Sequence, residues 1–402
     1  MWEHERTHTS YNCIDKLLYY PANYSGMKLP ALEKAKLFGK TVFLRADLDI
    51  PLSAISNQQS AIRGIEDDTR LKAALPTIEY LLKHGAKVIL AGHLGRPKVL
   101  NNESGIMNQE FSLLPVAKWF AKRFNHDSKF IIHNSNFGEF DGWELSDNLF
   151  LLENLRFYKG EENPTTASGL KFAKKLSSLA DIYVNDAFAV CHRAHASIVG
   201  VPKYLPHFAG LHLLEEVKVL SGVLENPNRP LVLIIGGAKI ETKLPLVEKM
   251  ADFADYVLVG GKIAKEFTEI LKTQNQNKSR KAALLVADLN QDETDITPKS
   301  IENFLQIINL SKTVVWNGPV GLINSEFRIQ NSELDTERGS RQLAEGIVRS
   351  KAYTVVGGGD TVGFLRNLGL IDKFSFVSTG GGAMLEFLSG KKLPGLAILF
   401  KR

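Results

Sequence analysis

The stretch Tyr353–Thr361 reads YTVVGGGDT and joins a short apolar strand to three glycines and an aspartate. Three more apolar segments of the second half also run into glycines: LVLII before Gly236, YVLV before Gly260 and VST before Gly380. One glycine pair after a strand is a weak signal, because many turns use glycine for backbone reasons alone. Four such strands form a pattern, since an open α/β sheet binds ligands at the carboxyl ends of its strands and helix N-terminal amides hold anions there. The second half is therefore predicted to form a sheet that binds phosphates with its backbone.

In the first half, the expected strands lead to charged side chains instead of glycines. The segments concerned are Thr41–Asp47, Lys87–His93, Phe150–Phe157 and Asp181–Asn185. Arginines lie in or beside these strand ends, at Arg45, Arg70, Arg96, Arg156 and Arg193. A single arginine is more often a salt-bridge residue, but its guanidinium group binds phosphate and carboxylate through two parallel hydrogen bonds. Together the arginines favour a site for a small substrate with several negative charges.

The length of 402 residues exceeds what one hydrophobic core usually supports, so we expect two domains. The hydrophobic content of 44% and the charged content of 23% are typical of a soluble globular protein. No apolar run reaches the roughly 18 residues that span a membrane. The net charge of +5 is small, and the two cysteines, Cys13 and Cys191, provide no disulfide framework. We therefore expect a cytoplasmic protein with no nucleic-acid or membrane partner.

Strands alternate with amphipathic helices along the chain, which predicts parallel sheets with right-handed crossovers. A proline-bearing break at 225–230 separates the two halves, and apolar residues at helical spacing predict a helix over 209–224 that joins the two sheets. Residues 1–26 have neither signal-peptide nor transit-peptide character, and we expect a flexible extension without chemistry. The expected fold class is α/β, with two doubly wound parallel-sheet (Rossmann-like) domains over 27–208 and 225–389.

The segment GGAKIETK at 236–243 places Lys239 and Lys243 at the start of an expected helix. Unpaired cations are unfavourable at a helix N-terminus, so this arrangement is explained if a polyphosphate lies between the helix and the lysines. The alternative is that both lysines are solvated surface residues. Asp360 is either a ligand of phosphate-bound Mg²⁺ or only a helix cap. The chain has no GxxxxGK[ST] Walker motif and no GxGxxG fingerprint after a strand, which argues against a nicotinamide enzyme.

Cys191, His192 and His195 form a second group of potentially reactive side chains. The i, i+3 spacing of the histidines could suit a metal site, but no third ligand is near in the sequence, so metal binding is not expected. A nucleophilic role for Cys191 is also disfavoured, because no partner residues assemble around it.

At the level of whole motifs, the chain resembles the phosphoglycerate kinase family from about Leu29 to the C-terminus. In the first half the shared motifs are LRADLDIP at 44–51, GHLGRP at 92–97, ENLRF at 153–157, and YVNDAF with HRAHAS within 183–197. In the second half they are GGAK at 236–239, WNGPVG at 316–321, GGGDT at 357–361 and STGGGA at 378–383. Chance agreement across so many separate segments is negligible.

The resemblance implies a hinge-bending enzyme of glycolysis and gluconeogenesis. Such an enzyme reversibly transfers the acyl phosphate of 1,3-bisphosphoglycerate to MgADP, giving 3-phosphoglycerate and MgATP, with no covalent enzyme intermediate. The implied cofactor is Mg²⁺ with the nucleotide, the implied partners are ATP or ADP and the phosphoglycerates, and the implied state is a monomer. The family pattern also makes the helix over 209–224 part of the hinge and returns segment 390–402 to the N-terminal domain.

By motif, the resemblance assigns residues to both ligands. The substrate-binding residues would be Asp47, Leu48, Asp49, Arg70, His93, Leu94, Gly95, Arg96, Arg156 and Arg193. The nucleotide-binding residues would be Gly236, Gly237, Ala238, Lys239, Lys243, Gly260, Asn317, Pro319, Asn324, Gly358, Gly359, Asp360 and Thr361. The catalytic residues would be Arg70, Lys239 and Lys243, with Asp360 on Mg²⁺ and with Gly380, Gly381 and Gly382 at a helix N-terminus facing the phosphoryl group.

Four positions depart from the family pattern. Asp49 stands where the family usually has asparagine, which places a second carboxylate near an anion. Asn324 stands where a glutamate contacts the nucleotide ribose, Lys262 replaces a common glycine, and Thr297 replaces the glycine of a D-I-G-P motif. These changes bear on nucleotide affinity and base preference more than on the reaction. The alternative is a catalytically weakened family member that acts as a binding or scaffold protein; retention of the three catalytic residues and Asp360 argues against it.

Overall fold

A computed structural model describes most of the chain. The described residues are 28–53, 64–97, 109–125, 133–273, 281–323 and 335–400. The extension over 1–26 and Asn324 lie outside the described residues. Within the described ranges, no helix combines enough length with enough apolar character to cross a membrane.

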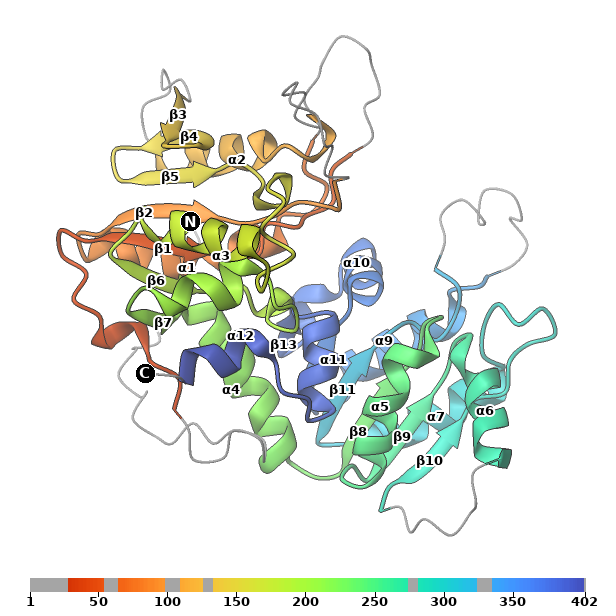
Figure 1. Ribbon diagram of the computed structural model, residues 1–402. Helices are drawn as coiled ribbons and strands as arrows, with labels where there is room; N and C mark the ends of the chain where they lie inside the picture. Colours follow the sequence, from red (N-terminus) through yellow and green to blue (C-terminus); the bar gives the residue numbers. More distant parts are fainter. Residues whose placement is uncertain are drawn as a thin grey trace, which may run out of the picture.

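The first half forms a seven-stranded sheet in the order β3-β4-β5-β2-β1-β6-β7 (Figure 1). Its parallel strands are β1 (Thr41–Arg45), β2 (Lys87–Ala91), β5 (Leu149–Leu152), β6 (Ile182–Asn185) and β7 (His207–Ala209). The α-helices of this half are α1 (Thr69–Lys83), α2 (Leu114–Phe124) and α3 (Ala167–Ser177). Because β1 and β2 lie in the middle of the sheet, their carboxyl ends bring sequence-distant side chains to one edge.

An antiparallel hairpin extends this sheet beyond the strands that the sequence predicts. Strand β3 (His133–Phe137) pairs with β4 (Phe140–Ser146), which pairs in turn with β5, and both pairs are antiparallel. Gly138, with a φ of 71°, lies in the connection. A turn this short can join only antiparallel neighbours, since a parallel crossover needs a dozen or more residues. The first sheet is therefore parallel except at this end, where the sequence does not predict the antiparallel hairpin.

The second half forms a six-stranded, wholly parallel sheet in the order β10-β9-β8-β11-β12-β13. The strands are β8 (Leu231–Ile235), β9 (Tyr256–Val259), β10 (Ala283–Val286), β11 (Thr313–Asn317), β12 (Tyr353–Gly357) and β13 (Phe376–Ser378). The helices are α5 (Ile240–Ala251), α6 (Ile263–Thr273), α7 (Pro298–Leu310), α9 (Arg338–Arg349), α10 (Gly359–Asn367) and α11 (Gly382–Leu388). Two α/β units built on mainly parallel sheets confirm the predicted fold class.

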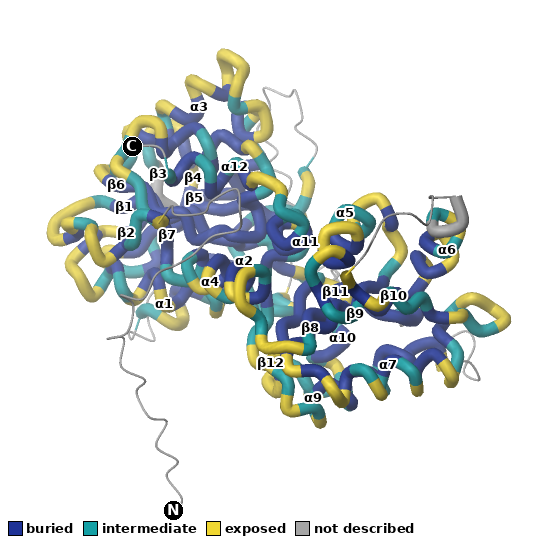
Figure 2. The backbone as a smooth tube through the Cα atoms, turned by 90° about the horizontal axis from the view of Figure 1, so that it is seen from below, coloured by how far each residue is buried: buried dark blue, intermediate teal, exposed yellow. Residues whose placement is uncertain are grey.

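Alternate residues of the central strands pack into different cores. In β1, Phe43 belongs to one buried cluster, while Val42 and Leu44 belong to another. In β8, Leu233 joins the cluster of Phe43, whereas Ile234 joins a third cluster under α7 and α9. The strands are accordingly buried on both faces, and exposed residues gather on the outer sides of the helices (Figure 2). Burial on both faces fixes the strand register and hence the positions of the side chains at the strand ends.

Helix α4 (Leu211–Glu225) connects the end of β7 to the start of β8 and contacts both halves (Figure 1). At its N-terminus, the backbone N–H of Leu213 donates to Asp186 Oδ1 at 3.0 Å. One turn later, the buried carboxylate of Glu216 accepts hydrogen bonds from Thr379 N and Ser378 Oγ, both at 2.7 Å. The helix predicted over 209–224 therefore exists, with ends shifted by one or two residues.

The C-terminal segment lies against the first half of the chain. Helix α12 (Pro394–Ala397) is followed by a short 3₁₀ helix over Ile398–Phe400. The N–H of Gly395 donates to the carbonyl of Cys191 at 2.9 Å, and Asn185 Nδ2 donates to the Gly395 carbonyl at 3.4 Å. The cysteine itself is buried, and burial raises the pKa of its thiol to about 12, so Cys191 is a packing residue in its protonated form.

Candidate active site

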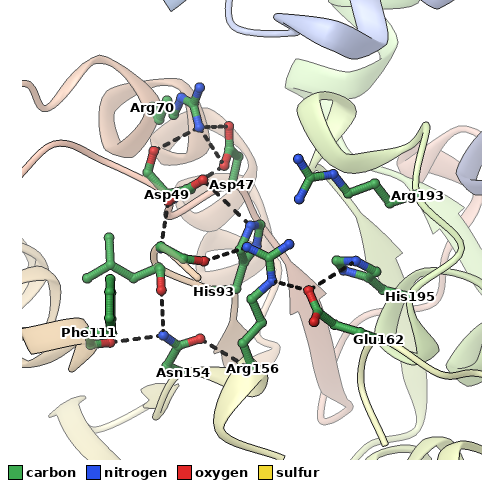
Figure 3. A network of polar contacts seen from close by, with 12 residues as sticks. Asp47, Asp49, Arg70, His93, Phe111, Asn154, Arg156, Glu162, Arg193 and His195 are labelled. Carbon is green, nitrogen blue, oxygen red and sulfur yellow. Dashed lines mark hydrogen bonds and ion pairs between the residues drawn. The ribbon is translucent and has the colours of Figure 1, made fainter. Parts of the chain in front are cut away.

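The carboxyl edge of the first sheet gathers charged side chains from several strands into one network (Figure 3). Asp47 and Asp49 follow β1, His93 follows β2, and Arg156 lies beyond β5. Arg70 joins them from the first turn of α1. The cluster that the strand-end pattern predicts thus exists in space.

Arg70 is held by both aspartates that follow β1. Its Nη1 lies 3.2 Å from Asp47 Oδ2 and donates to the carbonyl oxygen of Asp49 at 2.8 Å. Proximity to Asp47 raises the pKa of Arg70, while burial raises the pKa of Asp47 against the attraction of Arg70. These contacts all use one guanidinium nitrogen, so the side chain is oriented and still has further donors for a ligand.

Arg156 lies on a short 3₁₀ helix, Leu155–Phe157, and not in a strand. The expected strand over 150–157 ends at Leu152, because the side chain of Asn154 caps the 3₁₀ helix by accepting from Arg156 N at 3.0 Å. Arg156 Nε pairs with Glu162 Oε1 at 2.9 Å, and its Nη1 donates to the carbonyl of Gly95. Arg156 therefore links the loops after β2 and β5.

The histidines near the arginines are neutral at pH 7. His93 is fully buried, and burial together with Arg45 lowers its pKa well below the usual value. Burial and the same arginine lower the pKa of His195 to about 3. Arg45 Nη2 lies 3.0 Å from His93 Nδ1, and Arg45 Nε donates to Ser197 Oγ at 2.9 Å. Positive charge in this network consequently comes from the arginines, and His93 offers a neutral imidazole.

The other residues predicted to bind substrate differ in their burial and in their hydrogen-bond partners. Leu48 and Leu94 are buried, and the Leu94 carbonyl accepts from Asn154 Nδ2 at 2.7 Å. The N–H of Gly95 donates to Asp49 Oδ1 at 2.8 Å. Arg96 is exposed, whereas Arg193 is half-buried with its Nε 3.2 Å from His192 Nε2.

Sequence reasoning missed several members of this network. They are Asn154, Glu161, Glu162, His195 and Ser197. The spacing in the sequence suggests a role only for His195, as a possible metal ligand. The signal for Asn154 lay inside the ENLRF motif. Ser197 ends the HRAHAS motif. The role of Glu161 is visible only in three dimensions, because its carboxylate accepts from Ser197 N at 2.9 Å, 36 positions away in the sequence.

The carboxyl edge of the second sheet is built from glycines. Gly358 has a φ of 96°, a left-handed conformation that favours glycine, and directly precedes α10. At Gly236 a Cβ atom would lie 2.1 Å from the carbonyl oxygen of Pro319, so the close approach of these loops requires glycine. The amides at the start of α10 lie where the glycine pattern predicts an anion-binding element.

The two lysines at the start of α5 have different surroundings. Lys239 is the exposed N-cap residue. Lys243 is half-buried, and its Nζ donates to Asn317 Oδ1. Burial lowers the pKa of Lys243 to about 8, although Asp360 acts to raise it. A cation held out of water in this way is one that a bound phosphate would stabilise.

The other predicted nucleotide residues lie at or near the same edge. Gly237, Ala238 and Gly260 lie in the loops after β8 and β9. Thr361 is buried, and its Oγ1 accepts from Gly318 N at 2.9 Å, so its hydroxyl holds the WNGPVG loop in place. Gly380, Gly381 and Gly382 lead into α11.

Two departures from the family pattern lie in the described part of the second half, in addition to Asp49 in the first. Lys262 is exposed. Thr297 is the N-cap of α7, and its hydroxyl accepts from Ser300 N at 3.2 Å. The threonine thus gains a capping contact that glycine cannot make.

A cavity of about 460 Å³ lies between the two edges. Asp49 and Arg70 line it from the first half, and Gly358, Gly359 and Gly381 line it from the second. The charged cluster and the glycine edge therefore border one space.

Comparisons of this sequence with a family model and with curated proteins indicate the same family. The family model described as phosphoglycerate kinase matches residues 32–284 and 270–391. A phosphoglycerate kinase of Dictyoglomus turgidum is 38% identical, with 92% of this chain and 97% of that protein covered. One of Coprothermobacter proteolyticus is 36% identical, with 93% and 99% covered.

Solved structures agree with the sequence comparisons. The phosphoglycerate kinase of Coxiella burnetii superposes with a TM-score of 0.71 at 32% identity, covering 92% of this chain and 99% of that one. The enzyme of Pyrococcus horikoshii gives a TM-score of 0.70 at 27% identity, covering 92% and 98%. By sequence and by structure, this chain belongs to the phosphoglycerate kinase family.

Proposed function

We propose that this protein reversibly transfers a phosphoryl group between MgATP and the carboxylate of 3-phosphoglycerate, forming MgADP and 1,3-bisphosphoglycerate. The observation that carries the proposal is the shared cavity, which has Arg70 on one wall and the amides of Gly358 and Gly359 on the other. One wall suits a small anion held by side chains, and the other suits phosphates held by the backbone. Family membership supports the same reaction.

In this proposal the phosphoglycerate binds to the charged cluster of the first half. Arg156 and Arg193, with exposed Arg96, would hold its phosphate, since guanidinium groups bind phosphate bidentately. The neutral imidazole of His93 would donate a hydrogen bond and add no charge. Asp47, already paired with Arg70, would accept from a substrate hydroxyl.

The nucleotide would bind along the glycine edge, with its phosphates at the start of α10. Asp360 is an exposed carboxylate on the first turn of that helix. One carboxylate beside phosphates fits Mg²⁺, which usually takes one or two carboxylates and completes its shell with phosphate oxygens and water. When bound, Mg²⁺ would neutralise part of the charge on the nucleotide phosphates.

The chemistry would depend on position and charge, because the substrate carboxylate itself supplies the attacking oxygen. Arg70 from the first half and Lys239 and Lys243 from the second would neutralise the transferring group. No side chain of the site needs to form a covalent intermediate. Closure of the two halves would exclude water, which would otherwise accept the phosphoryl group.

We further propose the domain division that the sequence predicts, with α4 as part of the hinge. Asp186 of the first half caps this helix, and Glu216 on the helix binds Thr379 at the end of β13. A cytoplasmic location and a monomeric state belong to the same proposal.

Glu216 should make the stability of this junction depend on pH. Burial raises the pKa of Glu216 to about 7, from about 4.5 in an unfolded chain. Between these values the folded state holds a proton that the unfolded state has lost, so stability falls as pH rises through this window. Glutamine keeps the acceptor for Thr379 N and cannot titrate.

From pH 5 to pH 8, the unfolding free energy of the unmodified protein should therefore fall relative to that of Glu216→Gln, by an amount on the order of 2 kcal/mol. Urea unfolding at both pH values measures the difference, from which titrations shared by the two proteins cancel. A difference that stays constant with pH would refute the prediction.

Asp49 should weaken phosphoglycerate binding. Its carboxylate lies beside the arginines, and its Oδ1 accepts from Gly95 N at 2.8 Å. Asparagine retains an acceptor for that hydrogen bond and removes the charge. We expect Asp49→Asn to lower the KM for 3-phosphoglycerate about threefold to tenfold, which corresponds to about 1 kcal/mol of electrostatic repulsion. Initial rates over a range of 3-phosphoglycerate concentrations test this, and an unchanged or higher KM would contradict it.

The rival function is a binding or scaffold role without turnover. An assay with 3-phosphoglycerate and MgATP, coupled to reduction of the acyl phosphate by a dehydrogenase, separates the two. Steady turnover supports the kinase, whereas calorimetric binding of both ligands without turnover would support the rival.

A further inference from the structure

Arg366, which lies in the last turn of α10, reaches from the second half of the chain to the first. Its Nη1 lies 2.5 Å from Asp67 Oδ2, and its Nη2 donates to Thr69 Oγ1. Both partners lie at the start of α1. One guanidinium group therefore makes two contacts with the N-terminus of α1, a helix of the other half.

The two helices joined by this contact carry parts of both ligand sites. Arg70 directly follows Thr69 on the first turn of α1, and α10 begins at Gly359 beside the glycine edge. Arg366 is seven residues from Gly359, about 10 Å along a helix. Since helices are rigid over this distance, the contact ties the position of Arg70 to that of the α10 amides.

The surroundings of Asp67 show that the contact is built into the fold. Asp67 Oδ1 accepts from Thr69 N at 2.8 Å, which leaves Oδ2 to pair with Arg366. Although burial alone would raise it, the pKa of Asp67 is lowered by hydrogen bonds from Thr69 and Arg366. The side chains of Arg366 and Asp67 are only 30% and 24% exposed, so water screens the pair incompletely.

We infer that Arg366 is an interdomain positioning residue, whose contacts with Asp67 and Thr69 hold the two ligand-binding edges near their working separation before any ligand binds. The inference rests on the proposed function for its consequence in catalysis. Preorganisation of this kind lowers the cost of bringing both substrates together. Once both ligands are bound, their own contacts hold the halves, so the ion pair should affect KM and not kcat.

The test compares Arg366→Met with Arg349→Met. Arg349 is also in the last turn of its helix, and it pairs with Glu345 of the same helix at 3.6 Å. We expect Arg366→Met to raise the KM for both substrates about twofold to fivefold, the effect of one partly screened ion pair, with kcat within about twofold. The control should match the unmodified protein.

Small-angle scattering of the ligand-free proteins gives a readout independent of turnover. Arg366→Met should increase the radius of gyration relative to Arg349→Met, and 3-phosphoglycerate with MgADP should remove the difference. Asp67→Asn retains the oxygen that caps Thr69 and removes the ion pair, so it should reproduce both effects, and the double variant should add nothing.

An unchanged radius of gyration or an unchanged KM in Arg366→Met would overturn the inference, as would a large loss of kcat at constant KM. Failure of the proposed function would look different. In that case the unmodified protein would show no turnover, while scattering would still report whether Arg366 holds the halves together.

Discussion

Replacing Arg70 by methionine should lower kcat by about 10³-fold, since one cation on the transferring phosphoryl group contributes about 10³–10⁵ in rate. Arg70 is the guanidinium group that lines the cavity from α1 and is oriented by Asp47 and Asp49 O. Its loss removes charge from the place where negative charge develops in the transition state. Steady-state rates at saturating 3-phosphoglycerate and MgATP measure the effect.

Two controls separate this effect from a loss of folding. Removing Arg70 leaves the buried Asp47 without its partner, and protonation of that carboxyl, whose pKa is already raised, would relieve part of the strain. Circular dichroism should therefore show a folded protein. Arg70→Lys keeps the charge but not the forked geometry, so its kcat should lie between those of the other two proteins. A kcat for Arg70→Met within tenfold of the original would exclude the assigned role.

Lys243→Met should lower kcat by about 10²–10³-fold, the usual effect of removing one donor that stabilises developing charge. Asn317 Oδ1 holds the amine of Lys243 at the start of α5. Methionine has a similar length and no charge, so it fills the space without replacing the cation. Lys249→Met, at an exposed position of the same helix, is the matched control and should leave kcat unchanged.

Lys243 should also contribute to the number of protons that the protein takes up when nucleotide binds. Burial lowers the pKa of Lys243 to about 8 in the free protein, so near pH 8 about half of the molecules carry a neutral amine. A bound phosphate favours the charged form and raises that pKa, so binding of MgADP at pH 8 should take up about half a proton. Calorimetry in buffers of different ionisation enthalpy measures this uptake. An equal proton uptake in Lys243→Met would show that the lysine does not contact the phosphates.

Patterns local in the sequence predicted much of the architecture. The glycine-ended strands β8 and β9 have the expected extents, and β12 runs one residue further, to Gly357. An apolar run followed by glycines is a local signal. The helix expected over 209–224 is also present, as Leu211–Glu225. Parallel strands bring their carboxyl ends together, and this rule was enough to anticipate both ligand edges.

Features that depend on distant contacts could not be predicted in this way. The hairpin of β3 and β4 is antiparallel, and nothing in its apolar spacing predicts that direction. Arg45, one of the five arginines whose grouping favours an anion site, is fully buried and donates to Ser197, which lies 152 positions away. The contact between Arg366 and Thr69 joins residues 297 positions apart. Such pairings follow from how the elements pack and not from any local motif.

The most direct measurement of the central claim is the stoichiometry of phosphoryl transfer by the purified protein. The protein would be incubated with 3-phosphoglycerate, MgATP and hydroxylamine, which traps an acyl phosphate as its hydroxamate. Because hydroxylamine displaces phosphate from the acyl group, we predict that ADP, hydroxamate and inorganic phosphate form in equal amounts, and that all three disappear when 3-phosphoglycerate is omitted. Release of ADP with inorganic phosphate but without hydroxamate, or no release of ADP at all, would contradict transfer to the carboxylate.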